Sequence, residues 1–218
     1  MTEIHLSQSE AEHILRDWLG KQAGCTGIER LHGGACSAVF ALSFDIPPYE
    51  AVVKLADHSF LYEITGLNYL RRNTQLRVPE PYWHKPAGEL LTPEVLVIER
   101  LPGISLEQAR ISQNERAYID EQMADILVEL HSHKHETYGS VSCDEEYPRW
   151  LELFGPLIES WYDESKPRLT RPSKEIIPHL LEAMPSILED AGPPTLVHGD
   201  IWDANGSWCG RTTISPLG

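Results

Sequence analysis

The sequence has few of the features that mark membrane, secreted or nucleic-acid-binding proteins. No apolar run reaches the roughly 18 residues of a transmembrane helix, and the N-terminus has no apolar segment typical of a signal peptide. The 18 lysines and arginines are outnumbered by 33 aspartates and glutamates. The resulting net charge of −15 argues against nucleic acid or an anionic membrane as a partner. We therefore expect a cytoplasmic protein.

Cysteine is also scarce, and the four cysteines are widely separated: Cys25, Cys36, Cys143 and Cys209. They form no C-x-x-C pair, so neither a zinc site nor a disulfide framework is predicted, and free thiols in a reducing compartment fit best. The alternating His131, His133 and His135 follow the end of an expected helix. We interpret them as a polar helix terminus rather than as a metal site.

The most informative segment is residues 196–205, in which a short apolar run precedes the pattern H-x-D-x-x-x-x-N. This spacing suits phosphoryl transfer, in which positioning and charge stabilisation supply most of the catalysis. Asp200 would accept the proton of an attacking hydroxyl, and Asn205 would direct its amide oxygen at a magnesium ion. His198 would brace the loop from behind. The alternative is an ordinary loop, because Asp and Asn also favour turns.

Upstream, Lys54 stands inside residues 51–56, which are apolar otherwise and predict a short buried strand. A buried lysine is costly unless its ammonium meets a partner or a phosphate. Glu63 lies within an apolar stripe at helical spacing: Phe60, Ile64, Leu67 and Leu70. In kinase-like enzymes a Lys–Glu ion pair of this kind holds the lysine that contacts phosphate. The alternatives are a lysine that reaches solvent at a strand edge and a glutamate at the exposed edge of the stripe.

Two further segments have a place in the same chain order. Gly33 and Gly34 join two apolar strands, and such a turn lets backbone N–H groups approach phosphates closely. Residues 95–103 predict an apolar strand ending in a turn, where backbone groups between Glu99 and Leu101 would hydrogen-bond an adenine edge. An ordinary hairpin turn explains the first segment equally well, and the residues of the second do not exclude a simple buried strand with an exposed exit.

The remaining segments predict helices. Ser7-x-x-Glu10 and Ser112-x-x-Glu115 are typical of capping boxes, and the first of the two helices should end at Gly20.

Two more amphipathic stretches cover residues 148–165 and 174–190. Pro156 should break the first, and Pro185 should kink or split the second.

The order of glycine loop, lysine strand, glutamate helix, hinge strand, long helix and H-x-D resembles the aminoglycoside phosphotransferase and choline kinase superfamily. Within it, the segment LVHGDIWDAN is most similar to the fructosamine (ketosamine) kinase branch. The resemblance implies an α+β, protein-kinase-like fold with two lobes. Residues 1–102 would form a small nucleotide-binding lobe with an antiparallel sheet plus a helix, and residues 103–218 a mostly helical, incomplete lobe with the catalytic loop. It also implies ATP and Mg²⁺, with transfer of the γ-phosphate to a hydroxyl of a small molecule.

The residues after Asn205 depart from the pattern of that superfamily. There, an apolar strand, a turn and a second strand follow, and they carry an aspartate that chelates magnesium. The sequence of residues 206–218 has no such pattern of two apolar strands around a turn, and it contains no aspartate or glutamate. Loss of a metal ligand removes charge stabilisation at the transferring phosphate, so we expect an impaired enzyme.

Three functions are therefore open. The first is a kinase that phosphorylates a sugar–amine adduct or an aminoglycoside-like molecule, whose cationic groups would suit an acidic protein. The second is a catalytically inactive nucleotide-binding pseudokinase or a truncated remnant. The third is a helical partner-binding protein in which H-x-D is a coincidence. We favour the first, impaired in this chain.

Overall fold

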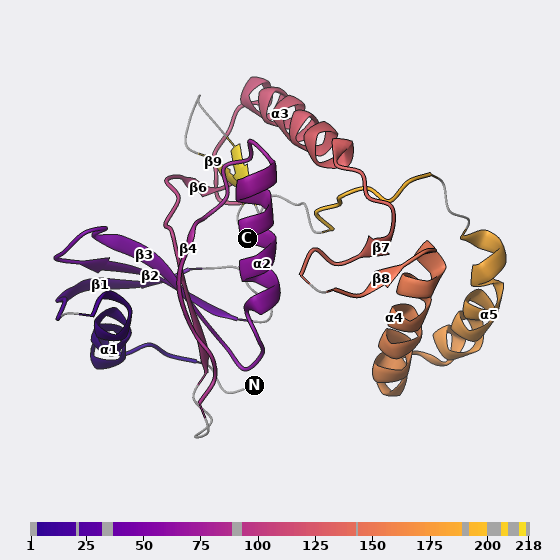
Figure 1. The fold of residues 1–218 in the computed structure, drawn as a ribbon, viewed down its shortest axis with the longest axis horizontal. Helices are drawn as coiled ribbons and strands as arrows, with labels where there is room; N and C mark the ends of the chain where they lie inside the picture. Colours follow the sequence, from indigo (N-terminus) through magenta and orange to yellow (C-terminus); the bar gives the residue numbers. More distant parts are fainter. Residues whose placement is uncertain are drawn as a thin grey trace. The chain divides into compact units, whose positions relative to one another are not determined.

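The computed structural model describes residues 4–20, 22–31, 37–88, 93–142, 144–188 and 192–199, with the backbone of residues 206–208 and 214–216. The chain divides into two units (Figure 1). Unit 1 contains residues 1–126 and 198–218, and unit 2 contains residues 127–197. The lobe boundary that the sequence places between residues 102 and 103 stays a prediction.

A five-stranded sheet forms the centre of unit 1, with the strand order β1-β2-β3-β5-β4 and antiparallel pairing throughout. The strands are β1 (Cys25–Arg30), β2 (Ala38–Phe44), β3 (Glu50–Ala56), β4 (Pro81–Lys85) and β5 (Glu94–Ile98). Both predicted apolar strands, the one with Lys54 and the one before Glu99, are present as β3 and β5. Every residue of β5 is buried, as expected for a strand covered on both faces.

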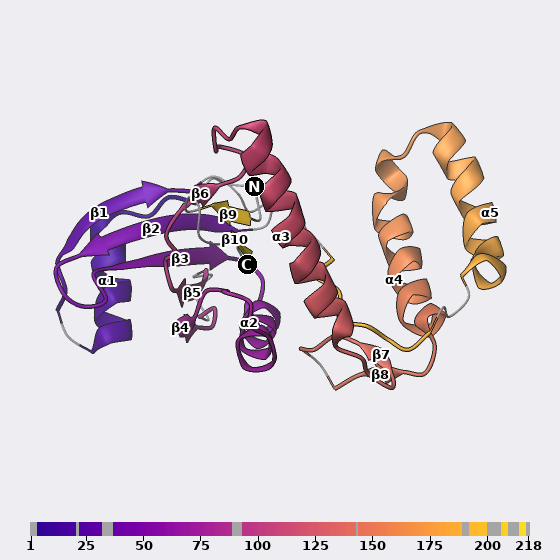
Figure 2. The same ribbon diagram turned by 90° about the horizontal axis from the view of Figure 1, so that it is seen from above.

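The sheet packs against one helix on each face (Figures 1 and 2). Side chains alternate along a strand, so each inner strand contributes to two cores. On β3, Val53 and Leu55 belong to the core that includes residues of α1 (Gln8–Leu19), whereas Val52 belongs to the core that includes residues of α2 (Leu61–Asn73). Odd-numbered residues of β3 and β5 therefore face the core on the α1 side of the sheet, and even-numbered residues face the α2 side.

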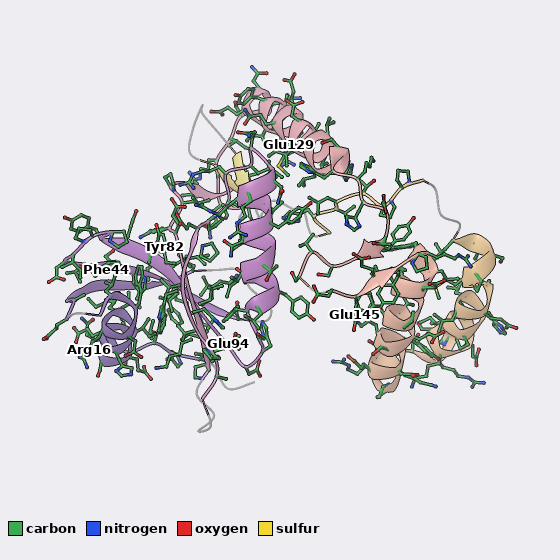
Figure 3. The ribbon with its side chains drawn as sticks, in the orientation of Figure 1. Arg16, Phe44, Tyr82, Glu94, Glu129 and Glu145 are labelled. Carbon is green, nitrogen blue, oxygen red and sulfur yellow. The ribbon has the colours of Figure 1, made fainter. Side chains whose placement is uncertain are left out.

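Helix α1 begins and ends as the sequence predicts. Ser7 and Glu10 form the capping box, and Gly20 ends the helix with a φ of 64°. The helix is anchored by Trp18, whose ring stacks on Tyr82 at a centroid distance of 5.5 Å and meets the edge of Phe44 at 5.9 Å. The rings of Tyr82 and Phe44 come from β4 and β2 (Figure 3).

Unit 1 also contains a second, three-stranded sheet with the order β10-β9-β6. Its strands are β6 (Ile104–Ser105), β9 (Gly206–Trp208) and β10 (Ile214–Pro216), all paired antiparallel. The expectation that residues 206–218 lack a strand pair is therefore wrong. Its cause is physical: β9 is held by backbone hydrogen bonds to β6, about a hundred residues earlier in the chain, and such pairing does not require an apolar run.

Helix α3 (Gln113–Ser132) follows the capping box at Ser112 and Glu115, in which the Glu115 carboxylate lies 2.7 Å from the Ser112 backbone nitrogen. Within unit 1, Ile119 packs with Leu106 in a small apolar core. None of the helices in the described part of the chain is both long and apolar enough to cross a membrane.

Unit 2 consists of a short hairpin and a helix pair. Its elements are β7 (Tyr138–Gly139), β8 (Glu146–Tyr147), α4 (Trp150–Ser165), the 3₁₀ helix η1 (Lys166–Arg168) and α5 (Arg171–Ile187). Helices α4 and α5 lie side by side (Figure 2). The predicted break at Pro156 is wrong, because α4 runs through it, and α5 likewise runs through Pro185 without splitting.

The two helices pack closely beside Pro156. Gly155, next to Pro156, is buried, and a Cβ built there would lie 3.7 Å from the Met184 methyl group of α5. On α4 itself, the rings of Trp150 and Phe154 stack at 4.6 Å. A proline removes one helical hydrogen bond, and contacts of this kind offset that loss.

Leu96, in the middle of β5, provides a test of the core. Its side chain is fully buried, so Leu96→Ala should lower the free energy of unfolding by about 2 to 5 kcal/mol through lost burial and a residual cavity. Leu61→Ala is the matched control, because Leu61 in the same unit is 58% exposed and its loss should change stability by less than about 0.5 kcal/mol. Urea denaturation followed by tryptophan fluorescence measures both. Equal effects of the two substitutions would contradict this assignment of the core.

Candidate functional site

Lys54 lies in the interior of the five-stranded sheet and is only 9% exposed. It is paired with Val39 of β2 on one side and with Leu96 of β5 on the other. Its even number places it on the sheet face that α2 covers, together with Val52 and Ala56. An unpaired ammonium in such a place would cost several kcal/mol, so the position requires a partner.

That partner is Glu63, in the first turn of α2. The Lys54 Nζ atom lies 2.7 Å from Oε1 and 2.9 Å from Oε2 of the carboxylate. The two side chains are 11% and 22% exposed, so water screens the pair much less than it would on an open surface. The predicted contact is confirmed, and the alternative of a solvent-facing lysine is wrong. The roles of both residues toward a nucleotide stay predictions.

The exit of β5, where the sequence predicts a hinge, is fixed by side chains. The Glu99 carboxylate accepts hydrogen bonds from both Nη groups of Arg77, one of them at 2.9 Å, and from the backbone N–H of Glu80 at 3.3 Å. The backbone N–H of Glu99 donates to the carbonyl of Glu80 at 2.8 Å. Leu101 is buried.

The charges around Glu99 also set its pKa. Burial raises the pKa of this carboxyl, but the hydrogen bonds and positive charge of Arg77, aided by the Glu80 N–H and by Arg71, outweigh burial. The pKa of Glu99 is consequently lowered from its ordinary value of 4.5. The same contact raises the pKa of Arg77. The strand exit is thus held by a pair that stays ionised at neutral pH.

Of the predicted catalytic loop, the structure describes His198 and Gly199. His198 is partly buried, and Gly199 has a φ of 82°, a conformation that favours glycine. Four predicted site residues lie outside the described part of the chain: Gly33, Gly34, Asp200 and Asn205. Their roles stay predictions.

The histidine run follows the end of α3. His131 is in the last turn of the helix, and His135 Nδ1 lies 3.1 Å from Thr137 Oγ1. Across the described residues, no three His, Cys, Asp or Glu side chains are grouped so that they could hold a metal ion. A metal site at these histidines is therefore not proposed.

The family model described as "Phosphotransferase enzyme family" (APH) matches residues 27–212. The chain belongs to this family. The match includes the lysine strand, the glutamate helix, the hinge strand and the H-x-D segment, and it confirms the resemblance seen in the sequence. No curated protein sequence matches the chain significantly.

Solved structures are similar to this phosphotransferase at low sequence identity. Aminoglycoside phosphotransferase APH(4)-Ia superposes with a TM-score of 0.71 at 13% identity, over 96% of this chain and 70% of that one. A thermostable mutant of the same enzyme, in a ternary complex with ADP and hygromycin B, gives 0.68 at 15% identity, over 91% and 67% of the two chains. A protein provisionally named fructosamine-3-kinase, from Haemophilus somnus 129PT, gives 0.66 at 17% identity, over 95% and 70%. Such low identities show the fold alone, and that fold is the predicted α+β, protein-kinase-like one.

One charged residue of the phosphotransferase was missed by sequence reasoning. Among the described residues, the buried charged side chains are Lys54 and Glu94, and Glu94 is only 6% exposed (Figure 3). A signal for it was present: Glu94 stands two residues before Leu96 and four before Ile98, both of which face α2. Strand alternation therefore places its carboxylate on the same face as Lys54.

The lowered pKa of Glu99 makes stability depend on pH. A carboxylate whose pKa is depressed by folding contributes stability above the unfolded value of 4.5, and that contribution is lost as pH falls through the folded-state pKa. Glu99→Gln should therefore be less stable than the wild type at about pH 7, and the difference should shrink toward about pH 3. Urea denaturation across this range measures it. A difference that is constant with pH would count against the Arg77 contact as its cause.

Proposed function

We propose that this chain is an ATP-dependent phosphotransferase that transfers the γ-phosphoryl group to a hydroxyl of a small molecule. The observation that carries the proposal is the Lys54–Glu63 pair, at 2.7 and 2.9 Å, within a chain of the phosphotransferase enzyme family. A buried lysine held by a glutamate from the adjacent helix is the arrangement by which kinase-like enzymes present an ammonium to nucleotide phosphates.

The other binding groups follow from the same arrangement. Lys54 would contact the α- and β-phosphates while Glu63 fixes its direction, and the backbone at Gly33 and Gly34 would approach the phosphates. Backbone groups of residues 99–101 would hydrogen-bond the adenine edge. The Arg77–Glu99 pair supports this proposal because it anchors Glu99, the first residue of that segment.

The proposed chemistry uses the predicted catalytic loop, the segment from His198 to Asn205. Asp200 accepts the proton of the acceptor hydroxyl, whose oxygen forms a bond to the γ-phosphorus as the bond to the β–γ bridging oxygen breaks. ADP leaves with that bridging oxygen, and the phosphoryl group stays on the acceptor. His198 braces the loop, and Asn205 would ligate Mg²⁺, whose charge offsets that of the transferring phosphate.

The acceptor class is proposed from similarity and charge together. Neighbours in fold include an aminoglycoside phosphotransferase with hygromycin B bound and a protein provisionally named fructosamine-3-kinase. A net charge of −15 suits an acceptor with amino groups. We therefore propose a sugar–amine adduct or an aminoglycoside-like molecule as the acceptor.

A second candidate is a pseudokinase that binds nucleotide without transferring phosphate. The observation that favours it is the absence of any aspartate or glutamate from residues 206–218, the segment that forms β9 and β10. In kinase-like enzymes a second carboxylate helps to hold the metal ions. The third hypothesis, a partner-binding protein with a coincidental H-x-D, is not supported, because the family match extends over residues 27–212.

Lys54→Met tests nucleotide binding. Removal of the ammonium should weaken the affinity for Mg-ATP, or lower kcat/KM where turnover is measurable, by roughly 100- to 1,000-fold, because a preorganised charge at the phosphates is lost. Lys85→Met is the control. Lys85 lies on the outer strand β4 and forms an ion pair with Asp17 of α1, so its replacement should leave the affinity for Mg-ATP unchanged. Calorimetric titration measures both. Equal affinities of Lys54→Met and the wild type would contradict the proposed function.

Asp200→Ala separates the two candidates. With a panel of fructosamine, ribulosamine and aminoglycoside acceptors, a transferase should release ADP in an acceptor-dependent way, and Asp200→Ala should abolish release while nucleotide affinity changes by less than about threefold. A coupled ADP assay with mass spectrometry of the acceptor measures this. Nucleotide binding without acceptor-dependent release, in the wild type as in the variant, would establish the pseudokinase instead.

A further inference from the structure

Glu94 is, with Lys54, one of the two buried charged residues in the described part of the chain, and one of its carboxylate oxygens makes three contacts. Oε1 accepts the backbone N–H of Phe60 at 2.8 Å and the Ser59 hydroxyl at 3.2 Å. His84 Nε2, on the neighbouring strand β4, lies 2.5 Å from the same oxygen. These partners come from the start of α2 and from the sheet, so the carboxylate joins the two.

The contacts add a second anion at the N-terminus of α2, beside Glu63 of its own first turn. Phe60, the N-cap residue, makes no side-chain cap hydrogen bond, and the N–H of the next residue, Leu61, donates to the Ser59 hydroxyl at 3.3 Å. The first N–H groups of a helix are unsatisfied and carry a partial positive charge, so an anion there is stabilising. Glu94 provides this anion from another element of the fold, at the end where α2 begins (Figure 3).

The same turn of α2 carries Glu63, three residues after Phe60. On the sheet, Glu94 is paired with Ala56, two residues beyond Lys54 on β3, and both charged residues face α2. The first turn of the helix is therefore attached to the sheet at two points, through Glu94 and through Lys54. The other end of α2 is held by Arg71 and Glu80, a pair that is 31% and 50% exposed and so more heavily screened.

From this geometry we propose that Glu94, together with His84, is a positioning residue for nucleotide binding. Glu94 fixes the start of α2 so that the Glu63 carboxylate stays in contact with the Lys54 ammonium. The inference rests on the proposed function, because it concerns the lysine that would contact the phosphates. Neither Glu94 nor His84 touches the nucleotide in this proposal. Both act through the Lys54–Glu63 pair.

The carboxylate is suited to this task in its ionised form. Burial raises the pKa of Glu94, but the hydrogen bonds from Phe60, His84 and Ser59 outweigh burial and lower the pKa from its ordinary value of 4.5. At neutral pH the group is thus an anion with three partners. Glu94→Gln keeps the size of the side chain and removes the charge.

The test is a double-mutant cycle on the affinity for Mg-ATP, with Glu94→Gln, Glu63→Gln and both together in the full chain. Glu94→Gln alone should weaken binding roughly 3- to 30-fold, the range of energetic coupling through positioning residues. In the Glu63→Gln background it should weaken binding less than about twofold, because the pair that Glu94 positions is already lost. A purely structural role would give the same factor in both backgrounds.

Two further comparisons isolate the contact. His84→Gln keeps an N–H donor near Glu94 and should bind Mg-ATP like the wild type, whereas His84→Leu removes it and should follow Glu94→Gln. Asp17→Asn is the matched control. It breaks an ion pair with Lys85, the residue after His84 on β4, and that pair attaches α1 to the sheet and does not involve α2. It should leave affinity unchanged. If Glu94→Gln does not fold, the two His84 variants decide the question.

The outcomes separate this inference from the proposed function. If the wild type binds Mg-ATP, Lys54→Met does not, and Glu94→Gln binds like the wild type or acts independently of Glu63→Gln, the positioning role is overturned and the proposed function stands. Equal binding by His84→Gln and His84→Leu overturns the part assigned to His84 and, where Glu94→Gln does not fold, the positioning role as a whole. If the wild type fails to bind Mg-ATP, both proposals fail together.

Discussion

The ion pair between Lys54 and Glu63 is the interaction on which the arrangement of unit 1 depends. An ammonium inside a sheet is tolerated only where a carboxylate meets it, and removal of one member of a buried pair typically costs about 3 to 5 kcal/mol. The carboxylate comes from α2, so this helix has to lie on the even-numbered face of β3 with its first turn over Lys54. The apolar contacts of Phe60 and Leu67 with the sheet then follow in register.

Strand β5 connects this pair to the predicted hinge. At its start, Glu94 accepts hydrogen bonds from the beginning of α2, and just past its end Glu99 is held by Arg77, which lies between α2 and β4. The four residues between the two anchors, 95–98, are all buried. The groups proposed to contact the phosphates and those proposed to contact the base are therefore connected through β5. A shift of α2 would change the positions of both sets of groups.

The end of the chain shows how backbone pairing and side-chain chemistry can separate. Residues 206–208 and 214–216 form a strand pair, although their sequence gives no apolar alternation. The backbone can adopt this pairing because β6 offers a partner edge. Metal binding is different, since it needs particular side chains, and no carboxylate stands in residues 206–218. The strand pairing of this segment therefore does not depend on whether the segment carries a metal-binding side chain.

The sequence by itself determined the elements whose signals are local: the capping boxes at Ser7 and Ser112, the lysine strand, and the amphipathic stripe that carries Glu63. It also suggested the Lys54–Glu63 contact, because a buried lysine needs an anionic partner and Glu63 lies on the apolar stripe of the next helix. Tertiary structure alone decided three other matters: α4 continues through Pro156 beside α5, β9 pairs with β6, and Glu94 caps a helix that begins 33 residues before it. Each depends on a partner distant in the chain, and local propensity contains no information about such a partner.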